Sequence, residues 1–357
     1  MNYREITLRE AIHFKNGKKR PTSEGNIPVY GGNGVLGYAG ESNYEHCIII
    51  GRVGACCGSV YLEEGKCWVS DNAIAAVPSG DNDTKFFYYL LKGLHLNERH
   101  IGISQPLLTQ EILNKINCEV PSYPDQQRIA ELLSSLDRKI NVNRKLNDNL
   151  ADLLQTIYQG RFGNDILAVN QGVLSDICSY STDKVAVSEL NVRTYFSTEN
   201  MLSGKAGSTE ATSLPTTSQT TACHKGDTLI SNIRPYFKKI VYCEDKCGCS
   251  TDVLCFTPSQ PCYSAYLFST LYADKFFAFM VAGSKGTKMP RGDKQQIMTY
   301  PVVLPSEEEL AGFNTIASPL LEQIYSNRAE NKRLSILRDT LLPKLMSGEI
   351  DVSAIQL

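Results

Sequence analysis

The sequence predicts an α/β protein built as a tandem repeat, in which a globular domain of strands and short helices is followed each time by one long helix. Three observations support this fold class. Residues 124–162 and 305–350 carry the same apolar heptad pattern, the two segments align with each other, and the residues before each of them follow the same order of apolar stretches. An apolar repeat of 3.5 residues that continues this long is typical of a coiled-coil helix.

Residues 1–121 form the first predicted globular domain. The stretch 46–78 alternates short runs of β-branched and small apolar residues with turn residues, which is typical of buried strands. Four glycines between positions 31 and 37 favour tight hairpin turns, because no Gly-Lys-Ser or Gly-Lys-Thr sequence follows them to complete a phosphate-binding loop. Residues 83–94 predict an amphipathic helix.

The first long helix is predicted at 122–162. Pro124 marks its start and Gly160 lies near its end, as is common at helix termini. Asn143 falls at heptad position a, where a buried Asn is expected to fix the register at some cost in stability. The narrow apolar seam formed by positions a and d consists of Ile129, Leu132, Leu136, Asn143, Leu146, Leu150, Leu153 and Ile157.

Residues 163–303 repeat the order of the first domain with little identity, and they form the second predicted globular domain. In this alignment Arg234 corresponds to Arg52, and both are expected at the ends of strands. Residues 203–222 are rich in Ser and Thr and predict a loop.

The second long helix is predicted at 304–350, with residues 351–357 as a C-terminal tail. Pro124 aligns with Pro305, and after an added heptad Asn143 aligns with Asn331; such an insertion lengthens a helix without rotating its apolar face. The alternative is two amphipathic helices on separate cores, but each is roughly three times the usual 11–12 residues. The seam continues in the same phase as Leu310, Phe313, Leu320, Ile324, Asn331, Leu334, Leu341 and Leu345.

The composition gives no global basic character, since the 357 residues carry a formal net charge of −2 and a pI of about 6.3. Phosphate binding needs only local positive charge, which several Lys and Arg clusters supply. No apolar run approaches the roughly 20 residues of a membrane helix, and the N-terminal residues lack a signal-peptide pattern, so the cytoplasm is the expected location.

The sequence offers little to an enzyme or metal hypothesis. It contains no GxSxG, HExxH or Walker motif. Residues 232–236 faintly resemble the Asn-Pro-Pro-Tyr motif of adenine methyltransferases, but the spacing differs and no cofactor loop accompanies them, so a strand end is predicted instead. The twelve cysteines include Cys243, Cys247 and Cys249, whose spacing lacks a second pair or a nearby His; free buried thiols are expected, and no metal site.

Four stretches carry a resemblance to a known family: LPSEEEL at 304–310, LLPKLMSGEI at 341–350, VYGGNGVLGY at 29–38 and GTKMPRGDKQQI at 286–297. Together with the two-domain layout, they resemble the specificity (S) subunit of type I restriction–modification enzymes over essentially the whole chain. The resemblance implies a non-catalytic protein with two target-recognition domains, each reading one half of a split DNA site. It also implies that the long helices pack antiparallel as a spacer, giving a pseudo-two-fold repeat.

The resemblance implies partners as well. These are two modification subunits that methylate adenine and dock on the helical region, and translocating restriction subunits. S-adenosylmethionine, ATP and magnesium are expected on those partners, and no cofactor is expected in this chain. The exposed partner-binding faces predict that the isolated chain can self-associate.

Base contacts are expected from polar side chains on loops that enter the major groove. The predicted residues are Asn33, Arg52, Ser104 and Gln105 in the first domain and Arg234, Lys285, Lys288 and Arg291 in the second. Phosphate contacts are expected at Lys18, Lys19, Lys238 and Lys239. The alternative is that Arg52 and Arg234 pair with Asp71 and Asp252, and that the others are ordinary solvated surface.

A helix from Pro124 to Gly160 would span about 55 Å at roughly 1.5 Å per residue, which corresponds to roughly 16 base pairs of duplex DNA. A rigid spacer of this length allows two half-sites separated by a fixed gap, and unlike domains imply an asymmetric site. The competing hypothesis is a coiled-coil scaffold for protein assembly without sequence-specific DNA reading. The acidic pI and the weaker second seam favour that alternative.

Overall fold

The computed structural model describes residues 1–102, 105–163 and 170–354. The chain divides into two compact units, which are described separately here. Unit 1 comprises residues 1–142 and 330–357, and unit 2 comprises residues 143–329. The predicted boundaries gave each long helix a segment of its own, whereas each compact unit includes one globular part and one portion of each long helix.

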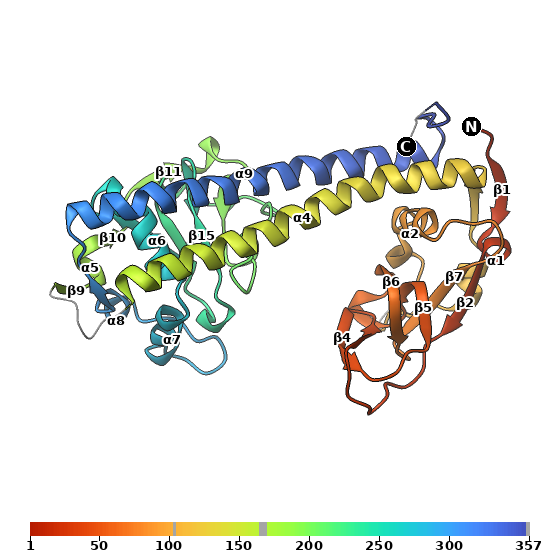
Figure 1. The fold of residues 1–357 in the computed structure, drawn as a ribbon, viewed down its shortest axis with the longest axis horizontal. Coiled ribbons are helices and arrows are strands. Elements are labelled where there is room, and N and C mark those ends of the chain that lie inside the picture. The colour runs from red at the N-terminus through yellow and green to blue at the C-terminus, as the bar shows by residue number, and fades with distance from the viewer. Residues whose placement is uncertain (103–104, 164–169, 355–357) are drawn as a thin grey trace. The chain divides into compact units, whose positions relative to one another are not determined.

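Unit 1 is built on a six-stranded sheet with the strand order β2-β7-β5-β6-β3-β4 (Figure 1). Helix α2 (Thr84–Gly93) packs against this sheet with Phe86 and Phe87 fully buried, and the side chain of Asp83 caps its start by accepting from the Phe86 N–H. The strands are β2 (Ile12–Asn16), β3 (Ile27–Gly31), β4 (Gly34–Ala39), β5 (Tyr44–Gly51), β6 (Val60–Val69) and β7 (Ala73–Pro78).

Within unit 1, a two-stranded sheet connects the globular part to the helical part. Strand β1 (Arg4–Thr7) pairs antiparallel with β8 (Asn117–Val120), and β8 leads directly into the first long helix. The short helices α1 (Leu8–Ala11) and α3 (Gln110–Asn114) flank these strands, and the chain also forms the 3-10 turns η1 (Gly54–Cys56) and η2 (Leu96–Glu98).

Unit 2 contains two four-stranded sheets, ordered β10-β17-β14-β15 and β11-β13-β16-β12, and the two-stranded sheet β18-β9. The strands are β9 (Gln171–Val173), β10 (Cys178–Tyr180), β11 (Lys184–Ala186), β12 (Tyr195–Phe196), β13 (Gln219–Cys223), β14 (Thr228–Ser231), β15 (Ile240–Tyr242), β16 (Cys247–Cys249), β17 (Val253–Pro258) and β18 (Pro301–Val303). The helices and 3-10 turns are α5 (Leu174–Ile177), η3 (Val187–Glu189), η4 (Pro235–Phe237), η5 (Pro261–Tyr263), α6 (Ser264–Tyr272), α7 (Asp274–Ala282) and α8 (Lys294–Met298).

The two units repeat one plan. The pair β9–β18 precedes α9 as β1–β8 precedes α4, and β10-β17-β14-β15 follows the same chain order as β2-β7-β5-β6. The predicted fold class, two tandem α/β units with two long helices, is confirmed. One prediction was wrong: the Ser/Thr-rich residues 203–222 are not wholly a loop, because their last residues belong to strand β13.

The long helices are α4 (Tyr123–Phe162) and α9 (Glu307–Met346), each of 40 residues. They run antiparallel where they meet within each unit. In unit 1 the guanidinium of Arg338 lies 2.6 Å from the carboxylate of Asp137, and in unit 2 the amide of Asn327 donates to Asn147 over 2.9 Å. As the numbers rise along α4 they therefore fall along α9, as the resemblance implied.

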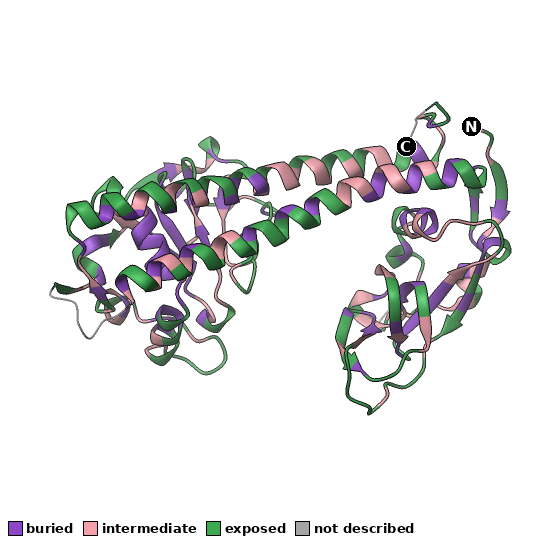
Figure 2. Ribbon diagram, in the orientation of Figure 1, coloured by how far each residue is buried: buried purple, intermediate pink, exposed green. Residues whose placement is uncertain are grey.

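Burial along the helices differs from the predicted seam in one respect (Figure 2). On α4 the predicted a positions Ile129 and Asn143 are buried, whereas Leu146 and Leu153 at predicted d positions are 40% and 47% exposed. The residues that follow them, Asn147 and Leu154, are buried instead. The inward stripe of α4 therefore combines positions a and e, while on α9 the predicted Leu310, Phe313, Ile324 and Leu345 are buried.

Candidate nucleic-acid interface

In unit 1, the turn between β6 and β7 gathers three segments that carry predicted DNA-binding residues. The N–H of Lys18 donates to Val69 over 3.0 Å, the N–H of Ser70 to Tyr30 over 2.8 Å, and the N–H of Arg52 to Asn72 over 3.0 Å. These backbone bonds place the start of the loop after β2, the end of β3 and the end of β5 around one turn.

A hairpin lies beside the end of β5. Ile101 and Leu107 form an isolated bridge, Leu107 also bridges Val53, and the N–H of Gly54 donates to Pro106 over 3.0 Å. The hairpin carries Gln105, which is exposed and directly precedes Pro106, the residue that accepts from Gly54. The predicted residue Ser104 lies outside the described residues.

Unit 2 repeats the bonds around Arg52 and Gly54, which form a frame of turn and hairpin common to both units. The N–H of Asn232 donates to Asp252 over 2.8 Å, the N–H of Arg234 donates to Pro290 over 2.7 Å, and Arg291 bridges both Ile233 and Lys285. The equivalent bonds in unit 1 start from Arg52 and Gly54.

These bonds correct the predicted alignment. Arg52 corresponds to Asn232 and Gly54 to Arg234, so Arg52 and Arg234 are not counterparts. Asp252 corresponds to Asn72 and not to Asp71. In unit 2, Asp252 forms its ion pair with Arg291, at 3.0 Å, rather than with Arg234.

Several cations of unit 2 gather on this frame. Lys285 pairs with Asp293 at 2.6 Å and Lys238 pairs with Asp274 at 2.9 Å, while the Lys239 ammonium donates to the Thr198 carbonyl. Each acid is held ionised by its lysine neighbours, since hydrogen bonds from Lys285 lower the pKa of Asp293. Hydrogen bonds from Lys205 and Lys238 likewise lower the pKa of Asp274. The remaining predicted residue, Lys288, is exposed at the tip of the hairpin.

In unit 1 the other predicted residues are exposed loop positions. Lys18 forms a bridge with Ser70, Lys19 follows it, and Asn33 occupies the turn between β3 and β4. The thiol of Cys56 lies 3.9 Å from the Asn33 amide oxygen, which places Asn33 beside the turn η1. The structure therefore brings Asn33 near the loop that follows Arg52.

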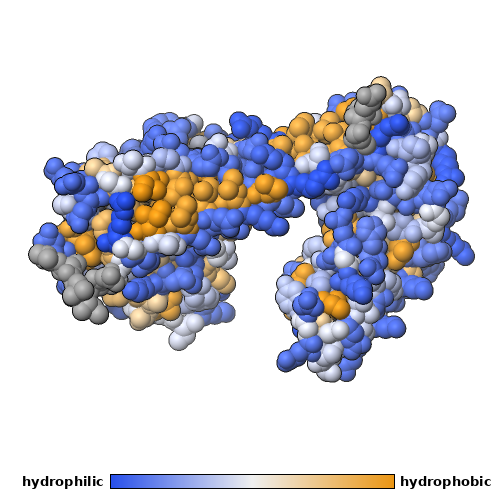
Figure 3. All heavy atoms as spheres, viewed as in Figure 1, coloured by the Kyte–Doolittle hydropathy of each residue, from blue (hydrophilic) through white to orange (hydrophobic). Residues whose placement is uncertain are grey.

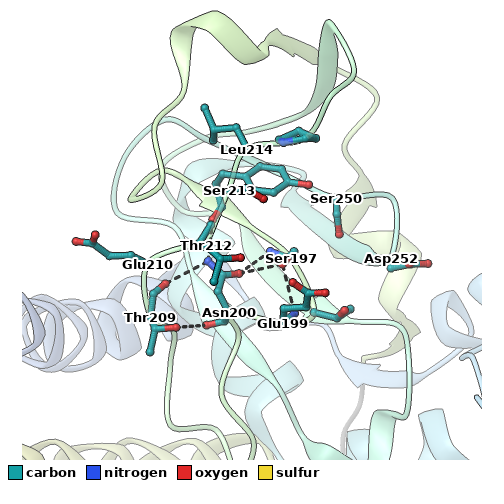
Figure 4. Close-up of a pocket in the computed structure, with 14 residues that line it drawn as sticks. Ser197, Glu199, Asn200, Thr209, Glu210, Thr212, Ser213, Leu214, Ser250 and Asp252 are labelled. Carbon is teal, nitrogen blue, oxygen red and sulfur yellow. Dashed lines mark hydrogen bonds between the residues drawn. The ribbon is translucent and has the colours of Figure 1, made fainter. Parts of the chain in front are cut away.

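Unit 2 also contains a polar pocket of about 310 Å³ between the segments 195–200 and 209–215, with Ser250 and Asp252 at one side (Figure 4). Asn200 organises it: its amide oxygen accepts from the Ser197 N–H over 2.7 Å, and its amide nitrogen donates to the Thr209 carbonyl over 3.1 Å. Glu199 and Asp252 line the pocket, so its chemistry suits amino groups and not phosphates.

The cysteines of unit 2 form a buried cluster in the core. Cys223, Cys243, Cys247, Cys249 and Cys255 pack together with Leu229 and Val253. All twelve cysteines are free thiols. Within residues 1–102, 105–163 and 170–354, no group of three or more His, Cys, Asp or Glu side chains has a geometry that would hold a metal ion.

Sequence reasoning missed two residues of this region, Tyr236 and Phe237. They are 50% and 39% exposed on the turn η4, between Arg234 and Lys238. A signal was available, because two adjacent aromatic residues flanked by cations and preceded by a proline are unusual in a buried strand.

Residues 2–151 match the family described as the type I restriction modification DNA specificity domain. The EcoprrI specificity subunit of Escherichia coli is 31% identical over 116 residues, which are 32% of this chain and 29% of that protein. The MjaIX specificity subunit of Methanocaldococcus jannaschii is 22% identical over 340 residues, covering 77% of this chain and 71% of that one. The chain thus aligns with under a third of the EcoprrI subunit.

The fold is shared with a solved structure. The type I restriction–modification S subunit from M. genitalium superposes with a TM-score of 0.63 at 20% identity, covering 97% of this chain and 96% of that chain. A repeated α/β unit with two long antiparallel helices defines the structural class. Residues 2–151 therefore match the specificity domain of that family, and the two-unit fold is shared with an S subunit. In the described part of the chain, no helix combines the length and hydropathy that a membrane crossing requires.

Proposed function

We propose that this chain is the non-catalytic subunit that gives a type I restriction–modification complex its DNA sequence specificity, with one half of a split site read by each unit. The observation that carries the proposal is the repeated frame of turn and hairpin. Both units form the same backbone bonds, yet they present different side chains from them. A constant frame with variable polar side chains is what reading of base edges requires.

The two half-sites are expected to differ in sequence. At equivalent, solvent-accessible positions unit 1 has Asn72 where unit 2 has Asp252. Asn favours adenine and Asp accepts from cytosine, so the two units are expected to select different bases. An asymmetric split site follows from this difference.

The long helices are proposed to act as the spacer and as the docking surface for partners. Their outward face in unit 2 carries Leu146 and Leu153 on α4 and Ile316 on α9, which are 39–47% exposed. Figure 3 shows the band of apolar surface over this helical part of unit 2. Exposed apolar surface of this kind marks a protein-interaction site.

The proposed partners are two adenine-methylating modification subunits, which dock on the helices, and the restriction subunits. S-adenosylmethionine, ATP and magnesium would be bound by those subunits. The complex is expected in the cytoplasm, where it meets DNA. An isolated chain with its apolar band uncovered is expected to self-associate.

The second candidate function is a coiled-coil assembly scaffold that no longer reads DNA. The same apolar band favours it, because assembly alone explains that surface. Salt separates the two hypotheses, since binding through phosphate contacts weakens steeply as salt rises.

The deciding experiment is a map of N6-methyladenine across the host genome with the gene present and with it deleted. The proposal expects a split, asymmetric motif that is methylated only when the gene is present. Methylation that does not depend on the gene, together with salt-insensitive behaviour of the reconstituted complex on DNA, would favour the scaffold.

A further inference from the structure

The turn η4 presents two aromatic side chains to solvent. Tyr236 and Phe237 lie side by side with ring centroids 4.7 Å apart and an interplanar angle of 57°. They are 50% and 39% exposed, so much of their ring surface is in water. Such exposure is unfavourable, because burying aromatic surface stabilises a folded protein.

The same turn exists in unit 1 without the aromatic residues. The N–H of Cys57 donates to Gly54 over 3.0 Å, and in unit 2 the N–H of Phe237 donates to Arg234 over 2.9 Å. By this correspondence Cys56 stands where unit 2 has Tyr236. The turn geometry therefore does not require aromatic residues.

The flanking residues of η4 are held in a strained conformation. Arg234 and Lys238 have φ values of 51° and 50°, in the left-handed region, where unit 1 has Gly54 and Gly58 with φ values of 71° and 86°. A residue other than glycine is uncommon there, and such strain concentrates at functional sites. Unit 2 thus carries two cationic side chains at positions where glycine would be relaxed.

The turn is fixed on both sides by backbone bonds. The Arg234 N–H donates to Pro290 over 2.7 Å, the Gly204 N–H donates to Phe237 over 2.8 Å, and the Lys205 N–H donates to Lys238 over 2.9 Å. The aromatic pair is therefore presented on a rigid support, which lowers the entropy lost on binding.

The surroundings of the aromatic pair carry net positive charge. Lys205 and Lys238 share the single carboxylate of Asp274, and Arg234 and Lys239 add two further cations. In the described part of the chain, Arg234 Nε is buried without a hydrogen-bond partner, and it lies beside the hairpin 285–291. Aromatic rings among cations are the combination that binds a polyanion with stacked bases.

We infer that Tyr236 and Phe237 form a wedge that stacks on, or partly unstacks, a base step of the DNA half-site bound by unit 2. Arg234 and Lys238 hold the flanking phosphates. Unit 1 lacks the wedge and reads its half-site by hydrogen bonds alone. The inference rests on the proposed DNA-reading function and adds the means by which the second half is recognised.

The test uses the complex reconstituted from the full chain and its modification subunits, with a pool of random duplex DNA. Sequencing of the bound fraction gives the preferred split site, and anisotropy gives the affinity for that duplex. The double variant Tyr236→Ala/Phe237→Ala is expected to bind at least about fivefold more weakly, as for loss of one stacked base. 2-Aminopurine placed in the unit 2 half should brighten with the wild type and not with the variant. The matched control is Tyr123→Ala at the start of α4, which removes an aromatic ring that is 40% exposed and should leave affinity unchanged.

A second variant keeps the test decisive if the first unfolds. Arg234→Gly/Lys238→Gly copies the relaxed turn of unit 1, so its melting temperature should be equal or higher while its affinity falls. A purely structural role would raise the melting temperature without loss of affinity. If the wild type selects a site and the double variant keeps full affinity and brightening, the wedge hypothesis is wrong while the proposed function stands. If the wild type selects no sequence, the proposed function itself fails.

Discussion

In the proposed function, single residues on a shared backbone frame decide what each unit recognises. The N–H that donates to the turn belongs to Arg52 in unit 1 and to Asn232 in unit 2. The N–H that donates to the hairpin belongs to Gly54 in unit 1 and to Arg234 in unit 2. In the proposed function, an exchange such as Asn72 for the aspartate found at Asp252 would change the preferred base without disturbing the backbone. Specificity is therefore expected to vary by side-chain exchange on the turns.

One acid restrains the positive charge of the wedge region. Asp274 accepts from both Lys205 and Lys238, at 2.8 and 2.9 Å. We expect Asp274→Asn to raise the affinity for non-specific duplex DNA, because it frees two ammonium groups for phosphates. The slope of log K against log salt should steepen by roughly 0.9 for each phosphate gained. Titration of binding against salt measures this, with Glu189→Gln, at a separate ion pair with Lys246, as control.

The pH dependence of that effect follows from the pKa of Asp274, which hydrogen bonds from the two lysines hold below its usual value. The carboxylate therefore stays charged in the folded protein down to a pH below the ordinary range of about 3.9. Wild-type affinity should show no gain from Asp274 between pH 7 and pH 5. Its stabilising contribution is lost only as the pH falls through the lowered pKa. A rise in wild-type affinity over pH 7 to 5 that Asp274→Asn abolishes would contradict this.

At the scale of elements, the two long helices are fixed in register by a buried polar pair. Asn327 donates to Asn147 over 2.9 Å and accepts from Gln323 over 2.8 Å. We expect Asn327→Ala to destabilise the chain by about 1–3 kcal/mol, because the Asn147 oxygen is left buried without its donor. Urea unfolding measures the change.

Two controls accompany that variant. Asn149→Ala on the exposed surface of α4 should change stability by no more than about 0.5 kcal/mol. The double variant Asn147→Leu/Asn327→Leu should be close to the wild type in stability, since both polar groups are removed together. Equal effects of Asn327→Ala and Asn149→Ala would rule out a role for the pair in register.

The apolar band of unit 2 makes a separate prediction for assembly. Leu153→Ser should leave stability within about 0.5 kcal/mol, because Leu153 is 47% exposed. It should weaken binding of the modification subunit roughly tenfold or more, since burial of a Leu contributes about 1.5–3 kcal/mol. Calorimetric titration with the modification subunit measures this, and Asp148→Ser on another face of α4 is the control. Unchanged binding by Leu153→Ser would place the docking surface elsewhere.

The helices show what sequence can and cannot predict. Length, polarity and the a positions of α4 follow from periodicity, so Ile129 and Asn143 were correctly expected inside. The prediction that Leu146 lies in the buried seam was wrong, because the neighbouring Asn147 is buried in its place. Asn147 is buried because it accepts a hydrogen bond from Asn327. That partner lies 180 residues away in the sequence, so no local pattern predicts the contact. The strained turn η4 was missed for a similar reason. Its φ values depend on bonds donated by Gly204 and Lys205 and on a bond that Pro290 accepts.

At the scale of the whole molecule, two helices of 40 residues each contribute to both units. At roughly 1.5 Å per residue each helix is about 60 Å long. The proposed spacer role predicts that helix length, and not the recognition frames, sets the gap between half-sites. A change of one heptad preserves the inward face of a helix and so isolates length as the variable.

Removing one heptad from each helix, residues 140–146 and 328–334, is expected to shorten the gap by about three base pairs, because seven residues span roughly 10 Å. Both half-site sequences should be unchanged in the N6-methyladenine map. Removing residues 328–334 from α9 alone mismatches the antiparallel pair and should alter the preferred gap or abolish methylation. Methylation at the original gap by the matched deletion would show that the helices do not act as a ruler, while loss of one half-site sequence would show that the helices shape the recognition frame itself.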